Sequence, residues 1–472
     1  ADDVIGKINF QAPNEGTGTD AILVSAAIQA ISEGDFSSSS NATSLNFMTG
    51  ASEAASNKLT ITSGGNVIIP STGGTLSTAT AGTSNFRAGV NAGNSIASGG
   101  NYNVVVGDEA GTAITTGINN TFLGSAAGND LTDADFNTAV GANSLREDTL
   151  GSKSTALGYY ALGNQNFTSA TDTNNTAVGY HAGLAVTTGI NNTLMGTASG
   201  DAITTGHSNT VVGSAAGTAV TTGINNVAIG YIALASATTA SDNVIVGKQA
   251  GFNITDSQYN VGIGNNAIQS LTTGDRNVAV GHSAMYGLTT ASDNIAIGNE
   301  AGVAITTGAE NVLMGSYAGD AITTGASNIA MGYNALGSVT TASYNVGIGQ
   351  SAGGAITTGA KNTLMGFAAG DALTEGEANV AIGYEALSGD SHGRRTVAIG
   401  HGALKVQDFN SETSSYNTAV GHNAGTAVTT GTLNTLIGGE AGDALTTGAQ
   451  NTALGYGSLG SSTTASYNTA LG

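Results

Sequence analysis

The sequence predicts an all-β protein: a parallel β-solenoid (β-roll) of 17-residue rungs, preceded by a small N-terminal β segment. A pattern of the form Asn-x-x-aliphatic-Gly recurs 22 times between residues 103 and 472, and a fixed period of this length is typical of stacked repeats. The step between copies is constant, as from Gly298 to Gly315 to Gly332, except for two longer steps. Only 9% of the residues are charged and 5% are aromatic, against 72 glycines, which fits a thin rod better than a globular enzyme.

Residues 1–80 form the predicted N-terminal β-rich segment. Four stretches alternate apolar and polar residues between runs of Gly, Asn and Ser, as strands do, at 4–13, 21–36, 41–52 and 58–70. Residues 21–32 also fit the period of a helix, so both interpretations are open there.

Residues 81–102 are rich in Gly, Ser and Asn and lead into the repeats. The sequence NFRAG at 85–89 is similar to a degenerate rung, since its Gly89 precedes the first regular glycine, Gly107, by almost the same step. We expect it to cover the open edge of the solenoid, whose shaft then runs from 103 to 472.

Each rung is predicted to contain two five-residue strands and two corners. The glycine of the pattern is called the closing glycine here. The residue three places before it is Val, Ile or Thr, and the residue one place before it is Val, Ile, Leu or Met. In an extended chain both side chains point to the same face. We predict that this face lines the core. The predicted core and ladder residues are represented by Asn226, Val227, Ile229, Gly230, Asn311, Met314, Gly315, Asn379, Ile382 and Gly383.

The second strand is predicted from an aliphatic residue followed by Thr-Thr, as at residues 322–324. Between the strands, Ala occupies the third place after the closing glycine in 18 of 21 rungs, which indicates a tight corner. The next place holds Gly or a large apolar residue such as Leu234, Met285 or Leu336.

Asparagine opens 20 of the 22 copies, with Ser154 and Thr396 as the exceptions. Stacked at one spacing, these side chains can form a ladder of amide hydrogen bonds. Alternatively, asparagine is used because it tolerates a left-handed turn. The two interpretations are equally compatible with the pattern.

The middle residue of the first strand points away from the predicted core, yet it is apolar or Gly in every rung. Such a stripe along the whole rod is more exposed apolar surface than a soluble monomer normally shows. We therefore predict an interchain stripe covered by other copies of the chain. Its largest members include Leu194, Leu313, Leu364 and Leu436.

The sequence NVAIG at 226–230 and at 379–383, with the small-residue corner that follows, resembles the repeat of trimeric autotransporter adhesin head domains. The resemblance covers residues 103–472. It implies a left-handed parallel β-roll with three chains packed around an axis, although the 17-residue rung is longer than that family's usual repeat.

Residues 3–10, 18–23 and 40–61 resemble segments of tail fibre and other structural proteins of tailed bacteriophages, particularly those of aquatic bacteria. In such fibres this kind of segment lies ahead of a fibrous shaft or tip. The resemblance implies a location in the virion, with other tail or virion proteins as partners and the host-cell surface, including its glycans, as the target.

Two irregular places interrupt the array, at 141–179 and 383–421. They lack the Thr-Thr stretch, and the second rung of each carries a four-residue insertion. Because insertions in solenoids project as loops, often on the binding side, Phe167, Arg394, Arg395 and Phe409 are candidate receptor contacts. The alternative is a surface loop without a specific role.

No catalytic group, cofactor site or metal site is predicted, so we expect no enzyme. The net charge of −21 argues against nucleic acid, and no apolar run is long enough for membrane insertion. His401 and His422 fall in neighbouring rungs but have no evident third metal ligand. Six tyrosines directly follow closing glycines and either stack on sugar rings or cover the corner or a chain interface.

Taken together, these patterns favour a structural fibre protein of a bacteriophage tail or virion appendage, a homotrimer that gives reach and host-surface attachment. The alternative is a trimeric adhesin on the bacterial cell surface. A third hypothesis is an ice-binding β-solenoid, because Thr occupies the eighth place after the closing glycine in 18 of 21 rungs.

Overall fold

The computed structural model describes residues 3–11, 24–34, 41–50, 55–68 and 80–472, which form two compact units. The described residues contain no helix, and therefore none that could span a membrane. Each unit is described by itself below.

The N-terminal unit is an antiparallel five-stranded sheet with the strand order β1-β2-β3-β4-β5. Its strands are β1 (Val4–Gln11), β2 (Val24–Ser32), β3 (Thr43–Thr49), β4 (Ser56–Ile61) and β5 (Val67–Ile68). Ile28 pairs with Ile8 on one side and with Phe47 on the other. The strand interpretation of residues 24–32 is thus confirmed over the helix, while 21–23 lie outside the described residues.

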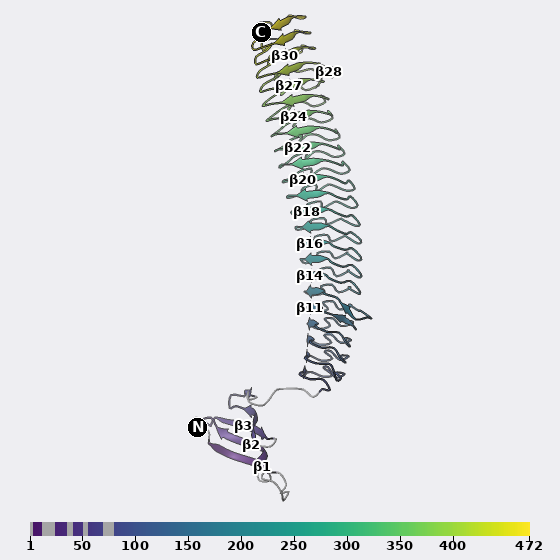
Figure 1. The fold of residues 1–472 in the computed structure, drawn as a ribbon, viewed down its shortest axis with the longest axis vertical. Helices are drawn as coiled ribbons and strands as arrows, with labels where there is room; N and C mark the ends of the chain where they lie inside the picture. The colour runs from purple at the N-terminus through teal and green to yellow at the C-terminus, as the bar shows by residue number, and fades with distance from the viewer. Residues whose placement is uncertain (1–2, 12–23, 35–40, 51–54, 69–79) are drawn as a thin grey trace. The chain divides into compact units, whose positions relative to one another are not determined.

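The second unit is the predicted parallel β-solenoid, which Figure 1 shows as a stack of short strands along one side of the rod, with bends on the opposite side. Each strand pairs in parallel with the strand of the next rung in strict register, as in Leu313 opposite Ala330. The stacked strands are β6 (Phe86–Ala88), β7 (Val104–Val106), β8 (Thr121–Leu123), β9 (Thr138–Val140), β11 (Thr155–Leu157), β13 (Thr176–Val178), β14 (Thr193–Met195), β15 (Thr210–Val212), β16 (Val227–Ile229), β17 (Val244–Val246), β18 (Val261–Ile263), β19 (Val278–Val280), β20 (Ile295–Ile297), β21 (Val312–Met314), β22 (Ile329–Met331), β23 (Val346–Ile348), β24 (Thr363–Met365), β25 (Val380–Ile382), β27 (Val397–Ile399), β29 (Thr418–Val420), β30 (Thr435–Ile437), β31 (Thr452–Leu454) and β32 (Thr469–Leu471).

The degenerate rung is a true first rung. Strand β6 lies in it, the Gly107 N–H donates to the Ala88 carbonyl at 2.8 Å, and Gly89 has the φ of 138° that closing glycines adopt. Asn85 is buried like the asparagines of the later rungs. The NFRAG prediction is therefore confirmed.

The closing glycine is required by its contact with the next rung. Gly315 has a φ of 138°, which L side chains rarely adopt, and a Cβ on it would lie 2.5 Å from the Gly332 carbonyl oxygen. Nearly every other closing glycine of the shaft meets its successor in the same way. Only glycine lets the backbones stack this closely.

The second predicted strand is absent from the regular rungs. The N–H groups of Thr306 and Gly308 both donate to the Thr323 carbonyl, so the chain bends where a strand would continue. Left-handed conformations at Tyr317 and Ser327 turn the next rung on either side of this segment. Short strands form beside the core only in the irregular places, as the pairs β10 (Gly151–Ser152) with β12 (Thr171–Asp172) and β26 (Gly393–Arg394) with β28 (Thr413–Ser414).

The predicted faces of the first strand are reversed. The middle residues Leu194, Leu313, Leu364 and Leu436 are fully buried inside their own chain, so they cannot form the predicted interchain stripe. The flanking residues Val227, Ile229, Met314 and Ile382, predicted as core, lie on the outer face, where Met314 is 38% exposed. The predicted positions of Asn226, Gly230, Asn311, Gly315, Asn379 and Gly383 in the ladder and the closing turn agree with the structure.

The core is narrow and filled by complementary volumes. Where the middle residue is large, as at Leu313, the fourth place after the closing glycine is Gly319, on which a Cβ would lie 2.8 Å from the Leu313 Cδ2. Where the middle residue is Ala330, that place holds the fully buried Leu336. The predicted plug residues are thus confirmed as core, and in most layers either strand or corner supplies the volume. Where both places are small, as at Gly347 and Gly353, large side chains of the neighbouring rungs such as Leu336 fill the space.

We predict that Gly315→Ala destabilises its rung by about 3 kcal/mol or more, because the Cβ requires both a strained φ and displacement of the next backbone. Hydrogen exchange of amides 311–332 measures this. Gly457→Asn is the control, since Gly457 has open space and a φ of 62° that Asn tolerates. Equal protection in the two variants would contradict the steric explanation.

Candidate functional site

A ladder of buried asparagines runs along the inside of one corner. The N–H of Asn328 donates to Asn311 Oδ1 at 3.0 Å, and Asn311 Nδ2 donates to the Gly325 carbonyl at 3.0 Å. The left-handed residue is Ser327, which precedes the ladder position. The side-chain ladder is therefore confirmed, and left-handed tolerance is not the reason for asparagine there.

The two irregular places contain polar groups within the core, and they are called module 1 (141–179) and module 2 (383–421). In regular rungs the seventh place after the closing glycine is a buried aliphatic residue, such as Ile322. In module 1 this column holds Asp148 and then Gln165, both fully buried. The modules thus replace two stacked aliphatic layers by a polar pair.

Each buried polar side chain of module 1 has a partner. Gln165 Nε2 donates to Asp148 Oδ2 at 2.5 Å and to Ser154 Oγ at 2.9 Å, and Asn175 Nδ2 donates to Gln165 Oε1 at 2.9 Å. Asp148 Oδ1 accepts the N–H groups of Gly151 and Phe167. Gln165 thereby bridges the place where Ser154 interrupts the asparagine ladder.

Module 2 repeats this arrangement in a distant part of the shaft. Gln407 Nε2 donates to Asp390 Oδ2 at 2.6 Å and to Thr396 Oγ1 at 3.2 Å, and Asn417 Nδ2 donates to Gln407 Oε1 at 2.8 Å. Sequence reasoning missed the Asp and the Gln of both modules. Their signal was present, because the seventh place is aliphatic or Ala in the other rungs, except for Ser462 in the last.

Burial dominates the ionisation of both module carboxyls. Desolvation raises the pKa of Asp148 and of Asp390, although the hydrogen bonds from the neighbouring glutamine and backbone lower it in part. The surrounding core therefore disfavours the ionised form of both carboxyl groups.

The candidate receptor contacts are largely engaged within the chain. Phe167 and Phe409 are only 6% and 5% exposed, so they pack into the modules and the predicted aromatic contacts are wrong. Arg394 forms an ion pair with Glu412 at 2.5 Å. Arg395 is exposed, donates to the hydroxyls of Ser414 and Tyr416, and lies over the Tyr416 ring.

The outer face of the strands carries a continuous apolar surface, called the outer stripe, formed by the residues three before and one before each closing glycine. No charged residue occupies either position in the 22 copies. From Val227 to Ile348, eight successive rungs carry only Val, Ile or Met there. Met195, Ile263, Ile297 and Met331 are each 36% to 46% exposed.

Aromatic rings gather on the corner beside each module. Phe367, Tyr384, His401 and His422 stack in sequence with centroids 5.1 to 5.2 Å apart. Where module 1 meets the next rung, the rings of Tyr159, Tyr160, Tyr180 and His181, together with Leu184, line a pocket of about 310 Å³, called the pocket of module 1 here. The tyrosines that follow the closing glycines are exposed, so they are available to a partner or ligand.

The chemistry available elsewhere is limited. Among the described residues, no group of three His, Asp or Glu side chains could hold a metal, and His401 and His422 stack on each other instead. Ser391, His392 and Asp408 lie together, but the carboxylate accepts from the serine Oγ and not from the histidine, so it does not orient the imidazole as a base.

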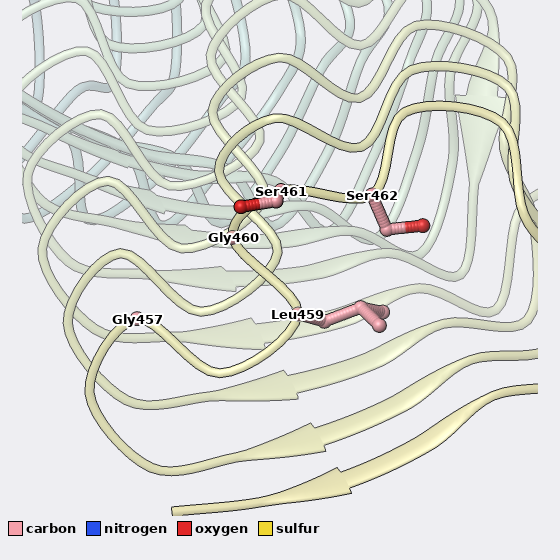
Figure 2. A pocket seen from close by; sticks show the side chains of 5 residues that line it. All are labelled: Gly457, Leu459, Gly460, Ser461 and Ser462. Atoms are coloured by element: carbon pink, nitrogen blue, oxygen red, sulfur yellow. The ribbon is translucent and has the colours of Figure 1, made fainter.

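Two further surface features, a hollow at the last rung and the rows of threonines, contain no cluster of ionisable side chains. Figure 2 shows a hollow at the last rung, lined by Gly457, Leu459, Gly460, Ser461 and Ser462. The threonine row at the eighth place donates its hydroxyls to carbonyls of the next rung, as Thr306 Oγ1 does to Thr323 at 3.2 Å. The second row, represented by Thr307, is exposed, whereas most threonines of the first row are partly buried.

Comparisons with protein-family models, with curated proteins and with solved structures found no match to this chain. Its fold class is therefore known from the structure alone.

We predict that Asp148→Leu destabilises module 1 by about 3 kcal/mol or more, because three donors lose their acceptor. The paired variant Asp148→Leu/Gln165→Leu should be less unstable than the sum of the two single variants, since two aliphatic layers are restored. Hydrogen exchange at Gly151 and Phe167 reports the change. Asp130→Leu, at an exposed position, is the control, and additive single effects would contradict coupling within the pair.

We predict that wild-type stability falls, relative to Asp148→Asn/Asp390→Asn, as the pH rises from about 4 through the raised folded pKa values. In this window the folded carboxyls still hold protons that the unfolded carboxyls have released, so their contribution is full at lower pH and is lost as pH rises. Urea unfolding at several pH values measures the difference. A difference that grows in favour of wild type with rising pH would contradict the assignment.

Proposed function

We propose that this chain is a structural fibre protein of a bacteriophage tail or virion appendage, in which three copies associate through the outer stripe to form a stiff shaft. The observation that carries the proposal is the outer stripe itself. Its side chains are partly exposed along the rod, and many of the larger ones, such as Met195 and Met314, are more than a third exposed; burying apolar surface contributes about 25 cal/mol per Å².

Another copy of the same chain is the partner that fits this stripe. The side chains recur once per rung, at a spacing of about 4.8 Å. A surface with a different repeat would fall out of step within a few rungs, whereas an identical rod stays in step along its whole length. The absence of charge at both positions also removes the main cost of bringing the stripes together.

The phage assignment rests on the resemblance of residues 3–10, 18–23 and 40–61 to tail fibre segments. Of these ranges, residues 18–23, 40 and 51–54 lie outside the described residues, and most of the described part belongs to strands of an antiparallel sheet. In this proposal the shaft gives reach and the corner rings contact the host surface. A trimeric bacterial adhesin is the alternative assignment for the same assembly.

We predict a native mass of about three times the 46.0 kDa chain by light scattering after size exclusion. Met314→Asp/Met331→Asp should reduce the mass toward that of one chain while the circular dichroism stays unchanged, because both charges enter the outer stripe. Leu313→Asp should instead unfold its rungs, since Leu313 is in the core.

The control is Thr307→Asp/Thr324→Asp, which adds the same charge on exposed positions outside the stripe in the same part of the rod. A monomeric wild-type protein would refute the trimer. An unchanged mass for the methionine variant would refute the outer stripe as the interface.

A further inference from the structure

The aromatic pocket of module 1 is defined by the orientations of its rings. The rings of Tyr159 and Tyr180 stack at 5.5 Å, and those of Tyr180 and His181 at 3.9 Å. Tyr160 stands nearly perpendicular to this stack, at 78° to Tyr159 and 88° to His181. The result is an open corner with aromatic walls in two orientations.

Module 2 provides an internal comparison. The buried Asp, Gln and Asn groups form the same hydrogen bonds in both modules. At the positions equivalent to Tyr159, Tyr160, Tyr180, His181 and Leu184, module 2 and the rung that follows it have His401, Gly402, His422, Asn423 and Thr426. A module therefore folds without the pocket residues, and the rings of module 1 are not needed for its core.

One basic and one acidic residue, Arg146 and Asp201, lie near the aromatic rings. Arg146 is exposed and donates to the Tyr160 hydroxyl at 3.2 Å. Asp201 occupies the place of Leu184 in the next rung and interacts electrostatically with His181, although its Oδ1 is buried and does not line the pocket. The pocket itself thus offers apolar ring surfaces and tyrosine hydroxyls, and Arg146 lies beside it as a cationic donor.

We propose that this pocket binds one ring of a neutral saccharide. A sugar ring has an apolar face that suits aromatic walls and hydroxyls that both donate and accept. A volume of about 310 Å³ is at the small end of ligand pockets, which suits one ring and not an oligomer. Arg146 disfavours an ammonium ligand, while Asp201 and the net charge of −21 disfavour an anionic one.

The inference rests on the proposed host-surface attachment and names the ligand class at one place on the rod. It is tested by saturation-transfer NMR on the full chain with glucose, galactose, mannose and N-acetylglucosamine as separate probes. A single ring in a pocket of this size should bind with a dissociation constant on the order of 1 mM. We expect transfer to at least one of these sugars.

The matched variant introduces the residues of module 2: Tyr160→Gly/His181→Asn/Leu184→Thr. Because Tyr160 has a φ of 55°, glycine is tolerated there, and the fold should persist. Sugar binding should weaken at least tenfold. The reciprocal variant, His401→Tyr/Gly402→Tyr/His422→Tyr/Asn423→His/Thr426→Leu, should add a second site of similar affinity.

No transfer to any of the four sugars, or equal transfer in wild type and the module 1 variant, overturns the proposal. Light scattering of each variant separates this outcome from failure of the fibre proposal. A module 1 variant with an altered native mass would show that the rings are an interchain contact, which also overturns the pocket. A monomeric wild type that still binds sugar would refute the trimer and leave the pocket standing.

Discussion

The structure depends on one constraint: successive rungs must approach to the spacing of a β-sheet at every corner as well as in the strand. Two devices meet it. The closing glycines let backbone lie directly on backbone, as at Gly315 over Gly332. The asparagine ladder supplies partners for the N–H and carbonyl groups that this approach buries, as Asn311 does for Asn328 and Gly325. Since both devices recur in each rung, the residues at every outward-facing position also form a continuous row along the solenoid.

The polar modules differ in kind from the ladder. The ladder makes all rungs alike, whereas Asp148 with Gln165 and Asp390 with Gln407 make four rungs unlike the rest. If the chain stacked one rung out of place, a buried carboxylate would lose its glutamine and face aliphatic groups, at a cost of several kcal/mol. In an array of nearly interchangeable rungs, such pairs distinguish the native register from its neighbours.

The sequence was sufficient for the fold class, the period and the entry rung, because glycine, asparagine and their constant spacing are direct consequences of stacking. The sequence was not sufficient to tell which face of the first strand points into the core. Both faces are apolar, so alternation alone cannot tell inside from outside, and the abundance of Ala in the middle place suggested a surface. A core this narrow needs small side chains, and Ala330 beside Leu336 fills one layer as completely as Leu313 beside Gly319 fills another.

The candidate site was predicted least well because it depends on contacts between rungs. Phe167 and Phe409 are in inserted segments and yet are buried, since each module has a polar core around which its loop folds back. The reversal of faces also strengthens the case for association. Large aliphatic residues such as Met314 and Ile297, and not alanines, lie outside, so the surface that another chain would cover is more apolar than the sequence first indicated.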